Sequence, residues 1–573
     1  MQRAVFLSLA LCLSAAVAWT TQVKPEPPQS NQPQAPAGIA TEPNSQTSAQ
    51  REELDFLGNA IRFYRKGDFD RAIQSYEQVL RLRPNSPDAH AGLTRVYLKK
   101  KDVARAYETV TKGLQATDSP TVHVALGEVY FRQGHIVEAE QEWVKVINSG
   151  YLNARAYMGL ARVNWALSNH KRGRTMIDKA HELDATDPDI TKLWVGKLSG
   201  AERIKYWEQY LASDSNDDAE TRTNLQHYLE YLRARAEDPR GACRLVSQIT
   251  ATETKLVPIR VDPKRLQGYS LPVAVNRKKS DLELDSGTSG IMLNSKLAEK
   301  ASVTLLSETE IGGVGDKGSR SGHMGLASSL KIGELEFQNC PVEVLDERSV
   351  MGHDGLIGLD VFAAFLVDVD FPNERLRLTQ LPTRPGENAP NITLQADRGE
   401  GGASEDEPAE KNAQPINVGN ARPRHLGPQD SYVAPEMQSY TKFYRFGHSM
   451  LLSTLIGDAP VKLFLLDTGS TNNLISPSAA EEVTMVHGDA RIIKGLNGSV
   501  NNVYRADKAI IQFAHMRQEN QNLLAIDMSH LSDRIGTEVS GVLGFEVLRL
   551  LDMKIDYRDG LVGFSLDPKR RYY

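Results

Sequence analysis

Two segments of this 573-residue chain repeat each other, and this duplication constrains the fold more than any other sequence feature. The first segment reads LELDSGTSGIMLNSKLAEK from Leu282, and the second reads LFLLDTGSTNNLISPSAAEE from Leu463. In each copy, an apolar run leads into Asp-[Ser/Thr]-Gly-[Thr/Ser] and a second apolar run leads into a helix start. Asn294 and Ser476 suit helix N-caps, and Pro477 suits a first helical turn. The duplication predicts two copies of one β-rich unit.

The two copies remain alike further along the chain. A glycine-rich turn follows each motif, with Gly313 and Gly315 in IGGVGD and Gly495 and Gly498 in KGLNG. The copies then end in GLIGLDVFAAFLVDVDF from Gly355 and GVLGFEVLRLLDMKIDY from Gly541. Residues 250–382 and 438–567 both consist of short runs of β-forming residues between Gly and Asn turns, which is typical of strands.

Proline marks the segments between the folded parts. Of 27 prolines, six fall in residues 22–50 and eight in residues 382–437. Segments of this composition bury too little apolar surface to offset the entropy of ordering. We therefore expect disordered linkers at 19–50 and 383–437.

Residues 51–240 show a different period. Gly58, Gly92 and Gly127 are 34 and 35 residues apart, and Ala72, Ala106 and Ala139 follow a similar spacing. A small residue every 34 positions suits helix contacts in stacked hairpins, and the segment resembles tetratricopeptide repeats. The alternative is a generic bundle of α-hairpins. The last helices, to about Arg235, are expected to form the polar end cap of an α-solenoid.

The duplicated unit resembles the lobe of retropepsin-like aspartic peptidases. That lobe is a β-barrel with an Asp-Thr/Ser-Gly turn, a glycine-rich flap and an apolar-apolar-Gly segment behind the turn, here Leu356-Ile357-Gly358 and Val542-Leu543-Gly544. The resemblance implies that Asp285 and Asp467 form a catalytic pair. Two adjacent carboxylates share one proton, so one acts as general base on a water and the other as general acid.

The resemblance also implies roles for the flanking residues. Gly287 and Gly469 allow the turns to approach each other, and Ser286 and Thr468 donate hydrogen bonds between the lobes. Thr288 and Ser470 bond the outer carboxylate oxygens, and Gly313, Gly315, Gly495 and Gly498 belong to the flaps. The chain departs from retroviral lobes, which often carry Arg after the final Gly, since Leu359 and Phe545 stand there.

Other readings of the sequence compete with this one. Asp370 and Asp556 precede turn signals, so we expect them at exposed hairpin positions rather than in a site. The histidines lack metal-ligand spacing, which argues against a metal, and no cofactor is expected. A net charge of −6 argues against a nucleic-acid partner.

The first 18 residues have the pattern of a secretory signal peptide, with Arg3, an apolar run and Ala16-Val17-Ala18. We expect a secreted or periplasmic protein without a transmembrane span in the mature chain; an uncleaved membrane anchor is the alternative. Cys243 and Cys340 would be its only thiols, and the sequence leaves open whether they pair.

The sequence therefore predicts an exported aspartic endopeptidase that cleaves a polypeptide substrate and binds a protein partner through its repeats. The alternative is a non-catalytic peptide-binding scaffold that keeps the peptidase fold. Whether the lobes pair within one chain or between chains is left open.

Overall fold

The computed structural model describes residues 48–213, 219–238, 240–248, 251–263, 265–312, 319–385, 430–496, 498–500 and 502–566. The predicted signal peptide, most of both predicted linkers, and Gly313 and Gly315 lie outside these ranges. Among the described residues, no helix combines the length and apolar character needed to cross a bilayer.

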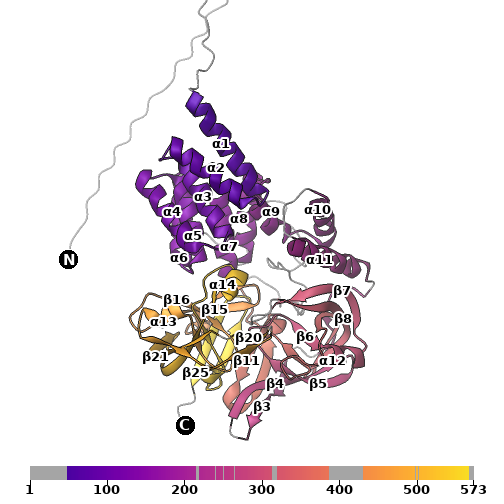
Figure 1. Ribbon diagram of the computed structural model, residues 1–573. Helices are drawn as coiled ribbons and strands as arrows, with labels where there is room; N and C mark the ends of the chain where they lie inside the picture. Colours follow the sequence, from indigo (N-terminus) through magenta and orange to yellow (C-terminus); the bar gives the residue numbers. More distant parts are fainter. Residues whose placement is uncertain are drawn as a thin grey trace, which may run out of the picture. The chain divides into compact units, whose positions relative to one another are not determined.

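A helical region comes first and has the paired arrangement that the 34-residue period predicts (Figure 1). Its helices are α1 (Ser48–Arg65), α2 (Phe69–Leu82), α3 (Pro87–Lys99), α4 (Val103–Ala116), α5 (Pro120–Arg132), α6 (Ile136–Asn148), α7 (Ala154–Ala166), α8 (His170–Leu183), α9 (Pro188–Val195), α10 (Gly200–Ala212) and α11 (Ala219–Glu237).

Two of the three repeated glycines, Gly92 and Gly127, make room for aromatic rings between neighbouring helices. A Cβ on Gly92 would lie 2.2 Å from the ring of Tyr76, and a Cβ on Gly127 would lie 2.5 Å from the indole of Trp143. Both rings are buried. Packing therefore requires a small residue at Gly92 and Gly127, whereas a Cβ on Gly58 would meet no atom within 4 Å.

Lobe 1 follows as a β-rich unit. Its elements are β1 (Arg244–Leu245), β2 (Thr252–Lys255), β3 (Val257–Asp262), β4 (Arg265–Val275), β5 (Lys278–Leu284), β6 (Ile291–Asn294), α12 (Ser295–Lys300), β7 (Thr304–Ile311), β8 (Arg320–Ile332), β9 (Leu335–Leu345), β10 (Gly355–Ile357), η1 (Leu359–Phe362), β11 (Phe365–Asp370), η2 (Phe371–Asn373) and β12 (Arg375–Gln380). The main sheet runs β1-β9-β6-β10-β5-β4-β8-β7, with β3 paired to β4. The Asn294 side chain caps α12, as its sequence position predicts.

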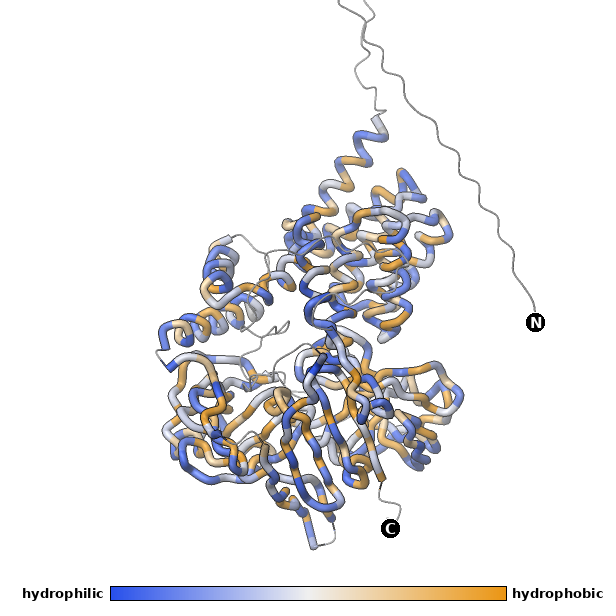
Figure 2. Tube along the Cα trace, turned by 180° about the vertical axis from the view of Figure 1, so that it is seen from behind, coloured by the Kyte–Doolittle hydropathy of each residue, from blue (hydrophilic) through white to orange (hydrophobic). Residues whose placement is uncertain are grey.

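Lobe 2 repeats this plan. Its elements are η3 (Pro435–Met437), β13 (Thr441–Lys442), β14 (Tyr444–Phe446), β15 (Ser449–Ile456), β16 (Lys462–Leu466), β17 (Leu474–Ile475), α13 (Pro477–Glu481), β18 (Val486–Asp489), β19 (Ile493–Gly495), β20 (Gly498–Val500), β21 (Val503–Phe513), β22 (Met516–Ile526), α14 (Ser529–Ile535), β23 (Gly541–Leu543), α15 (Phe545–Leu548), β24 (Leu551–Asp556) and β25 (Leu561–Leu566). Its main sheet runs β14-β15-β16-β23-β17-β22-β21-β18. The predicted fold class, a helical repeat region followed by two β-rich lobes, is confirmed. Apolar and polar residues alternate along many strands of the lobes (Figure 2).

A third sheet joins the two lobes. It runs β13-β25-β24-β11-β12-β2, so strands of lobe 1 and lobe 2 meet where β11 pairs with β24. The prediction that Asp370 and Asp556 occupy exposed hairpin positions is wrong, because both are buried in this sheet. Each still closes a turn, since Asp370 accepts from Asn373 N at 3.1 Å and Asp556 accepts from Asp559 N at 3.0 Å.

The end of the segment predicted as linker 383–437 is ordered in the structure. Ala434 and Met437 are buried, and both line a small apolar cluster with Leu561. The linker prediction therefore extends too far, because proline and polar residues outnumber the few apolar side chains that anchor this stretch.

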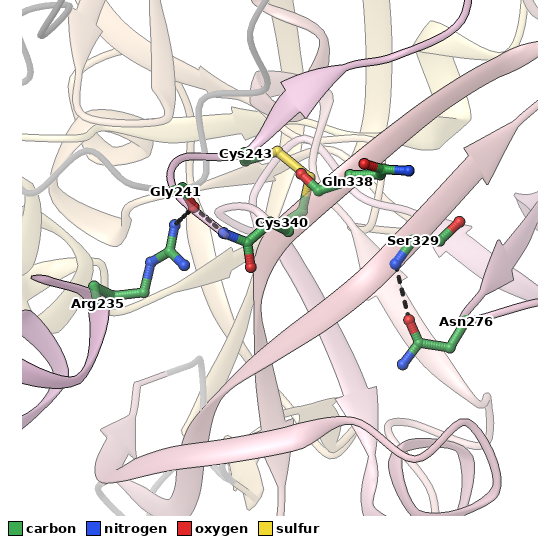
Figure 3. The surroundings of a disulfide bond; sticks show 8 residues. Arg235, Gly241, Cys243, Asn276, Ser329, Gln338 and Cys340 are labelled. Carbon is green, nitrogen blue, oxygen red and sulfur yellow. Dashed lines mark hydrogen bonds between the residues drawn. A yellow bond between two sulfur atoms is a disulfide. The ribbon is translucent and has the colours of Figure 1, made fainter. Parts of the chain in front are cut away.

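The end of the helical region is fastened to lobe 1. Cys243 and Cys340 form a disulfide that links the segment after α11 to β9 (Figure 3). Arg235 of α11 donates to the carbonyl of Gly241, beside this bond (Figure 3). Helix α11 also packs against β7, so strand β7 covers part of the predicted end cap.

Candidate active site

Asp285 and Asp467 face each other across the two lobes. Each follows a central strand, β5 or β16, and each backbone N–H donates at 3.0 Å to the strand behind it, Asp285 to Ile357 and Asp467 to Leu543. A Cβ on Gly287 would lie 2.8 Å from the Asp467 carboxyl carbon, and a Cβ on Gly469 would lie 2.4 Å from that of Asp285. Only glycine permits this approach of each turn to the opposite carboxyl group.

Ser286 and Thr468 form a reciprocal clasp between the lobes. The Ser286 hydroxyl donates to the carbonyl of Leu466, and the Thr468 hydroxyl donates to that of Leu284, both at 2.9 Å. Each hydroxyl oxygen also accepts the other residue's backbone N–H at 2.9 Å. All these groups lie in the buried seam, so the clasp fixes the separation of the two aspartates.

The two carboxyl groups have different hydrogen-bond partners. Asp285 accepts from Gly287 N at 2.8 Å and from the Thr288 hydroxyl at 2.9 Å, as the resemblance implies. Asp467 accepts only backbone N–H groups in its own turn, from Gly469 at 2.9 Å and Ser470 at 3.2 Å. The expectation for the Ser470 hydroxyl is wrong, because it donates instead to the carbonyl of Asn472 at 3.0 Å.

The surroundings of the pair favour the protonated form of the Asp467 carboxyl group. Burial, the Asp285 charge and a hydrogen bond with the Asp285 side chain raise the pKa of Asp467 well above its ordinary value. Two adjacent carboxyl groups cannot both ionise cheaply. The arrangement provides one proton donor and one proton acceptor on opposite sides of a single site.

Matching rows of side chains extend from the two aspartates across the sheets. Residues at i and i+2 share a strand face, so Glu283 lies on the Asp285 side and Leu465 on the Asp467 side. The strand registers continue these rows as Glu283, Leu356, Met292 and Glu343 in lobe 1, and as Leu465, Val542, Leu474 and Leu524 in lobe 2. The lobe-1 row ends in a carboxyl group on both sides, whereas the lobe-2 row is apolar.

A hairpin of lobe 2 connects the two rows. Gly495 and Gly498, predicted as flap residues, are paired at the end of β19 and β20. Leu496 at the tip packs against a lobe-1 cluster that includes Met292 and Leu356, while Ile493 packs against the cluster of the lobe-2 row. The hairpin therefore contacts the apolar clusters that contain residues of both rows. The lobe-1 glycines Gly313 and Gly315 lie outside the described residues.

Two glutamates of the lobe-1 row were not predicted from the sequence. Burial and the Asp285 charge raise the pKa of Glu283 to about 7. Burial and the Asp360 charge likewise raise the pKa of Glu343 to about 7. The alternation in LELDSG could have identified Glu283, because it places that side chain on the same strand face as Asp285.

Asp360 and His448 support the turn of Asp285. Asp360, which follows the position where retroviral lobes often carry Arg, accepts from Gly290 N at 3.0 Å and from the Ser289 hydroxyl at 3.2 Å. His448 of lobe 2 contacts the Gly287 carbonyl through Nε2 at 3.2 Å. No local sequence signal marks His448, because its partner lies 161 residues away.

Metal ligands are not gathered in this region. Within the ranges that the structure describes, no group of three or more His, Cys, Asp or Glu side chains could hold a metal ion.

Segments in both parts of the chain match known sequence families. Residues 271–361 and 452–547 match the aspartyl protease family, and residues 63–119 and 123–188 match tetratricopeptide repeat families. A curated relative, the UBA domain-containing protein Mud1 of Schizosaccharomyces pombe, is 32% identical over 108 residues. That match covers 18% of this chain and 31% of the relative, so the chain spans less than a third of its length.

Solved structures of tetratricopeptide proteins are also similar to part of the chain. The pilF protein of Pseudomonas aeruginosa is 16% identical, with 33% of this chain and 86% of that chain covered and a TM-score of 0.22. TTC0263, a thermophilic TPR protein of Thermus thermophilus, is 18% identical, with 32% and 98% covered and a TM-score of 0.25. The family matches place tetratricopeptide-like segments before two segments that are similar to aspartyl proteases.

Proposed function

We propose that the protein is an aspartic-type endopeptidase whose single active site is assembled from both lobes of one chain. The observation that carries this proposal is the placement of Asp285 and Asp467 at one seam, clasped by Ser286 and Thr468. The pair lies at the junction of the two lobes, and the match to the aspartyl protease family supports a polypeptide as the substrate.

The chemistry follows from the single shared proton. Asp285 takes a proton from a water, and the oxygen of that water attacks the peptide carbonyl carbon. Asp467 gives its proton to the carbonyl oxygen, which produces a tetrahedral diol. Asp285 then gives its proton to the amide nitrogen while Asp467 takes a proton from one hydroxyl of the diol. The C–N bond breaks, the new carboxyl group leaves, and the carboxyl pair returns to its starting state.

We further propose that the protein is exported and that the repeats bind a protein partner. The signal-like residues 1–18 support export, and so does the Cys243–Cys340 disulfide, because disulfides persist mainly in oxidising compartments. Tetratricopeptide repeats support a protein partner, since stacked helical repeats form extended binding surfaces.

The test is cleavage of an unfolded protein by the full chain and by its Asp467→Asn variant. We expect the variant to lose at least about 10³-fold in kcat, because removing one member of a catalytic unit leaves little activity. Ser470→Ala is the matched control, since the Ser470 hydroxyl bonds Asn472 rather than the carboxyl group. Wild-type cleavage rates in Asp467→Asn would refute the proposal, and absent cleavage in wild type would favour a peptide-binding scaffold.

A further inference from the structure

Lobe 2 donates hydrogen bonds to backbone carbonyl groups of the helical region. The Thr537 hydroxyl, which is fully buried, donates to the carbonyl of Phe131 at 2.6 Å. The next N–H, that of Glu538, donates at 2.9 Å to the carbonyl of Arg132. The loop after α14 thus binds the carbonyl groups at the C-terminal end of α5, which lack partners within the helix.

Charge pairing reinforces the same contact. Asp533 in α14 forms ion pairs with Arg132 of α5 and, at 3.2 Å, with Lys101. The Arg132 and Asp533 side chains are mostly buried, with 16% and 19% exposed. Removing one member of such a buried pair destabilises the contact, because the other charge is left without a partner.

The apolar contact is continuous between the two parts. The Phe131 and Phe446 rings lie 5.9 Å apart, and Arg162 stacks on Phe131 at 4.1 Å from the ring centroid. A Cβ on Gly134 would lie 3.4 Å from Leu463 in β16. One buried cluster includes Trp143 and Ile177 of the helices as well as Leu465 and Val542 of the lobe-2 row. Apolar burial on this scale is the main favourable contribution to such an interface.

A second contact joins α8 to the segment that leads into lobe 2. The Asp430 carboxylate accepts from Lys171 N at 2.9 Å and from Arg172 N at 2.7 Å, in the first turn of α8. The Asp430 carbonyl accepts from Arg384, which also pairs with Asp559 at 2.6 Å. The helical repeat region, called the array below, therefore contacts lobe 2 at two separate places.

The first contact is connected through the chain to the strand that supports Asp467. Residues 537–540 connect the contact at Phe131 and Arg132 with β23. Ser540 N donates at 2.8 Å to the carbonyl of Leu463. Strand β23 lies parallel to β16, and its Leu543 carbonyl accepts the Asp467 N–H. Displacing the loop at Thr537 would therefore move the strand that supports Asp467.

We propose that lobe 2 is the docking partner of the tetratricopeptide array within the same chain, and that this docking positions β23 behind Asp467. A protein partner supplied in trans then binds the part of the array that lobe 2 leaves uncovered. The contact itself is independent of catalysis, whereas its consequence for cleavage rests on the proposed function.

Hydrogen exchange of the full-length protein tests the docking. In Asp533→Lys, we expect the amides of residues 537–543 to exchange at least about tenfold faster, because the new charge faces Arg132 and Lys101. Strand β9 of lobe 1 should keep its exchange rates. Adding Arg132→Glu should restore slow exchange. The matched control is Asp507→Lys, whose carboxylate pairs within lobe 2 with His487 at 3.2 Å.

Thr537→Val provides a second variant if Asp533→Lys does not fold. It removes only the hydroxyl that bonds Phe131, so residues 537–543 should exchange about two- to tenfold faster. If cleavage is measurable, kcat should fall while KM is retained. Unchanged exchange at 537–543 in the folded variants, or equal acceleration in Asp507→Lys, would overturn the proposal. A protein without cleavage activity would leave the exchange result valid.

Discussion

The rows of side chains that extend from Asp285 in lobe 1 and from Asp467 in lobe 2 lie on equivalent strands but carry different residues. Glu283 and Glu343 of lobe 1 occupy the positions that Leu465 and Leu524 hold in lobe 2. The lobe-2 row continues into an apolar cluster shared with the helical array, whereas the glutamates keep raised pKa values beside Asp285 and Asp360. The equivalent rows of the two lobes therefore differ in both charge and packing partners.

The attachment of the two lobes differs in the same way. Lobe 1 is fastened to the end of the helical region by the Cys243–Cys340 disulfide. Lobe 2 is fastened by packing, by the Asp533 ion pairs and by the Asp430 cap on α8. We therefore expect reducing conditions to weaken the attachment of lobe 1 to the helical region and to leave the attachment of lobe 2 intact.

Removing the disulfide should have the largest effect on stability. Cys243→Ser is expected to lower the free energy of unfolding by about 2–5 kcal/mol, because the bond closes a long loop. The two cysteines are 97 residues apart. Denaturant titration measures the change, and wild-type protein in reductant should behave like the variant. An equal loss of exchange protection in β9 and β16 would contradict the difference between the lobes.

Replacing Glu283 with leucine, the residue at the equivalent position of lobe 2, should change the pH dependence of stability. Because the folded-state pKa of Glu283 is raised to about 7, its protonated form stabilises the fold at low pH, and that contribution disappears as pH rises through about 7. Glu283→Leu should remove this slope and stabilise the protein above pH 7 by about 1–3 kcal/mol. Unfolding curves from pH 4 to pH 8 measure it; parallel curves for wild type and variant would contradict the assignment.

The smallest expected effect concerns the hydroxyl groups beside the dyad. Thr288→Val removes a hydrogen bond to Asp285, and about 0.5–1.5 kcal/mol of carboxylate stabilisation should be lost, which corresponds to about a two- to tenfold change in kcat. Ser470→Ala should leave kcat near the wild-type value, since its hydroxyl bonds Asn472. Steady-state kinetics compares the two variants; equal losses would show that the turns are equivalent after all.

The duplication explains why so much of the site could be predicted. Asp285, Asp467 and the clasp residues stand in a motif whose spacing is repeated, so each copy supports the interpretation of the other. Ser470 differs from Thr288 because Asn472 offers a nearby carbonyl, and a motif does not contain that choice of rotamer. Asp370 and Asp556 precede real turns, but strand pairing between the lobes buries them.

The contact between the array and lobe 2 left only a partial signal in the sequence. Strand β16 carries apolar residues on both faces, Leu463 and Leu465 on one side and Phe464 and Leu466 on the other. β5 alternates with Glu283 instead. Apolar residues on both faces indicate that both faces are covered, but no local pattern names Phe131 and Arg132 as the residues that cover this one.

One assay tests most directly whether a single chain builds a complete site. Wild type, Asp285→Asn, Asp467→Asn and an equimolar mixture of the two variants are compared for cleavage of an unfolded protein. Pairing within the chain predicts an active wild type, two inactive variants and an inactive mixture, because each molecule in the mixture lacks one aspartate. Recovered activity in the mixture would show that lobes pair between chains, and activity in either single variant would contradict the dyad itself.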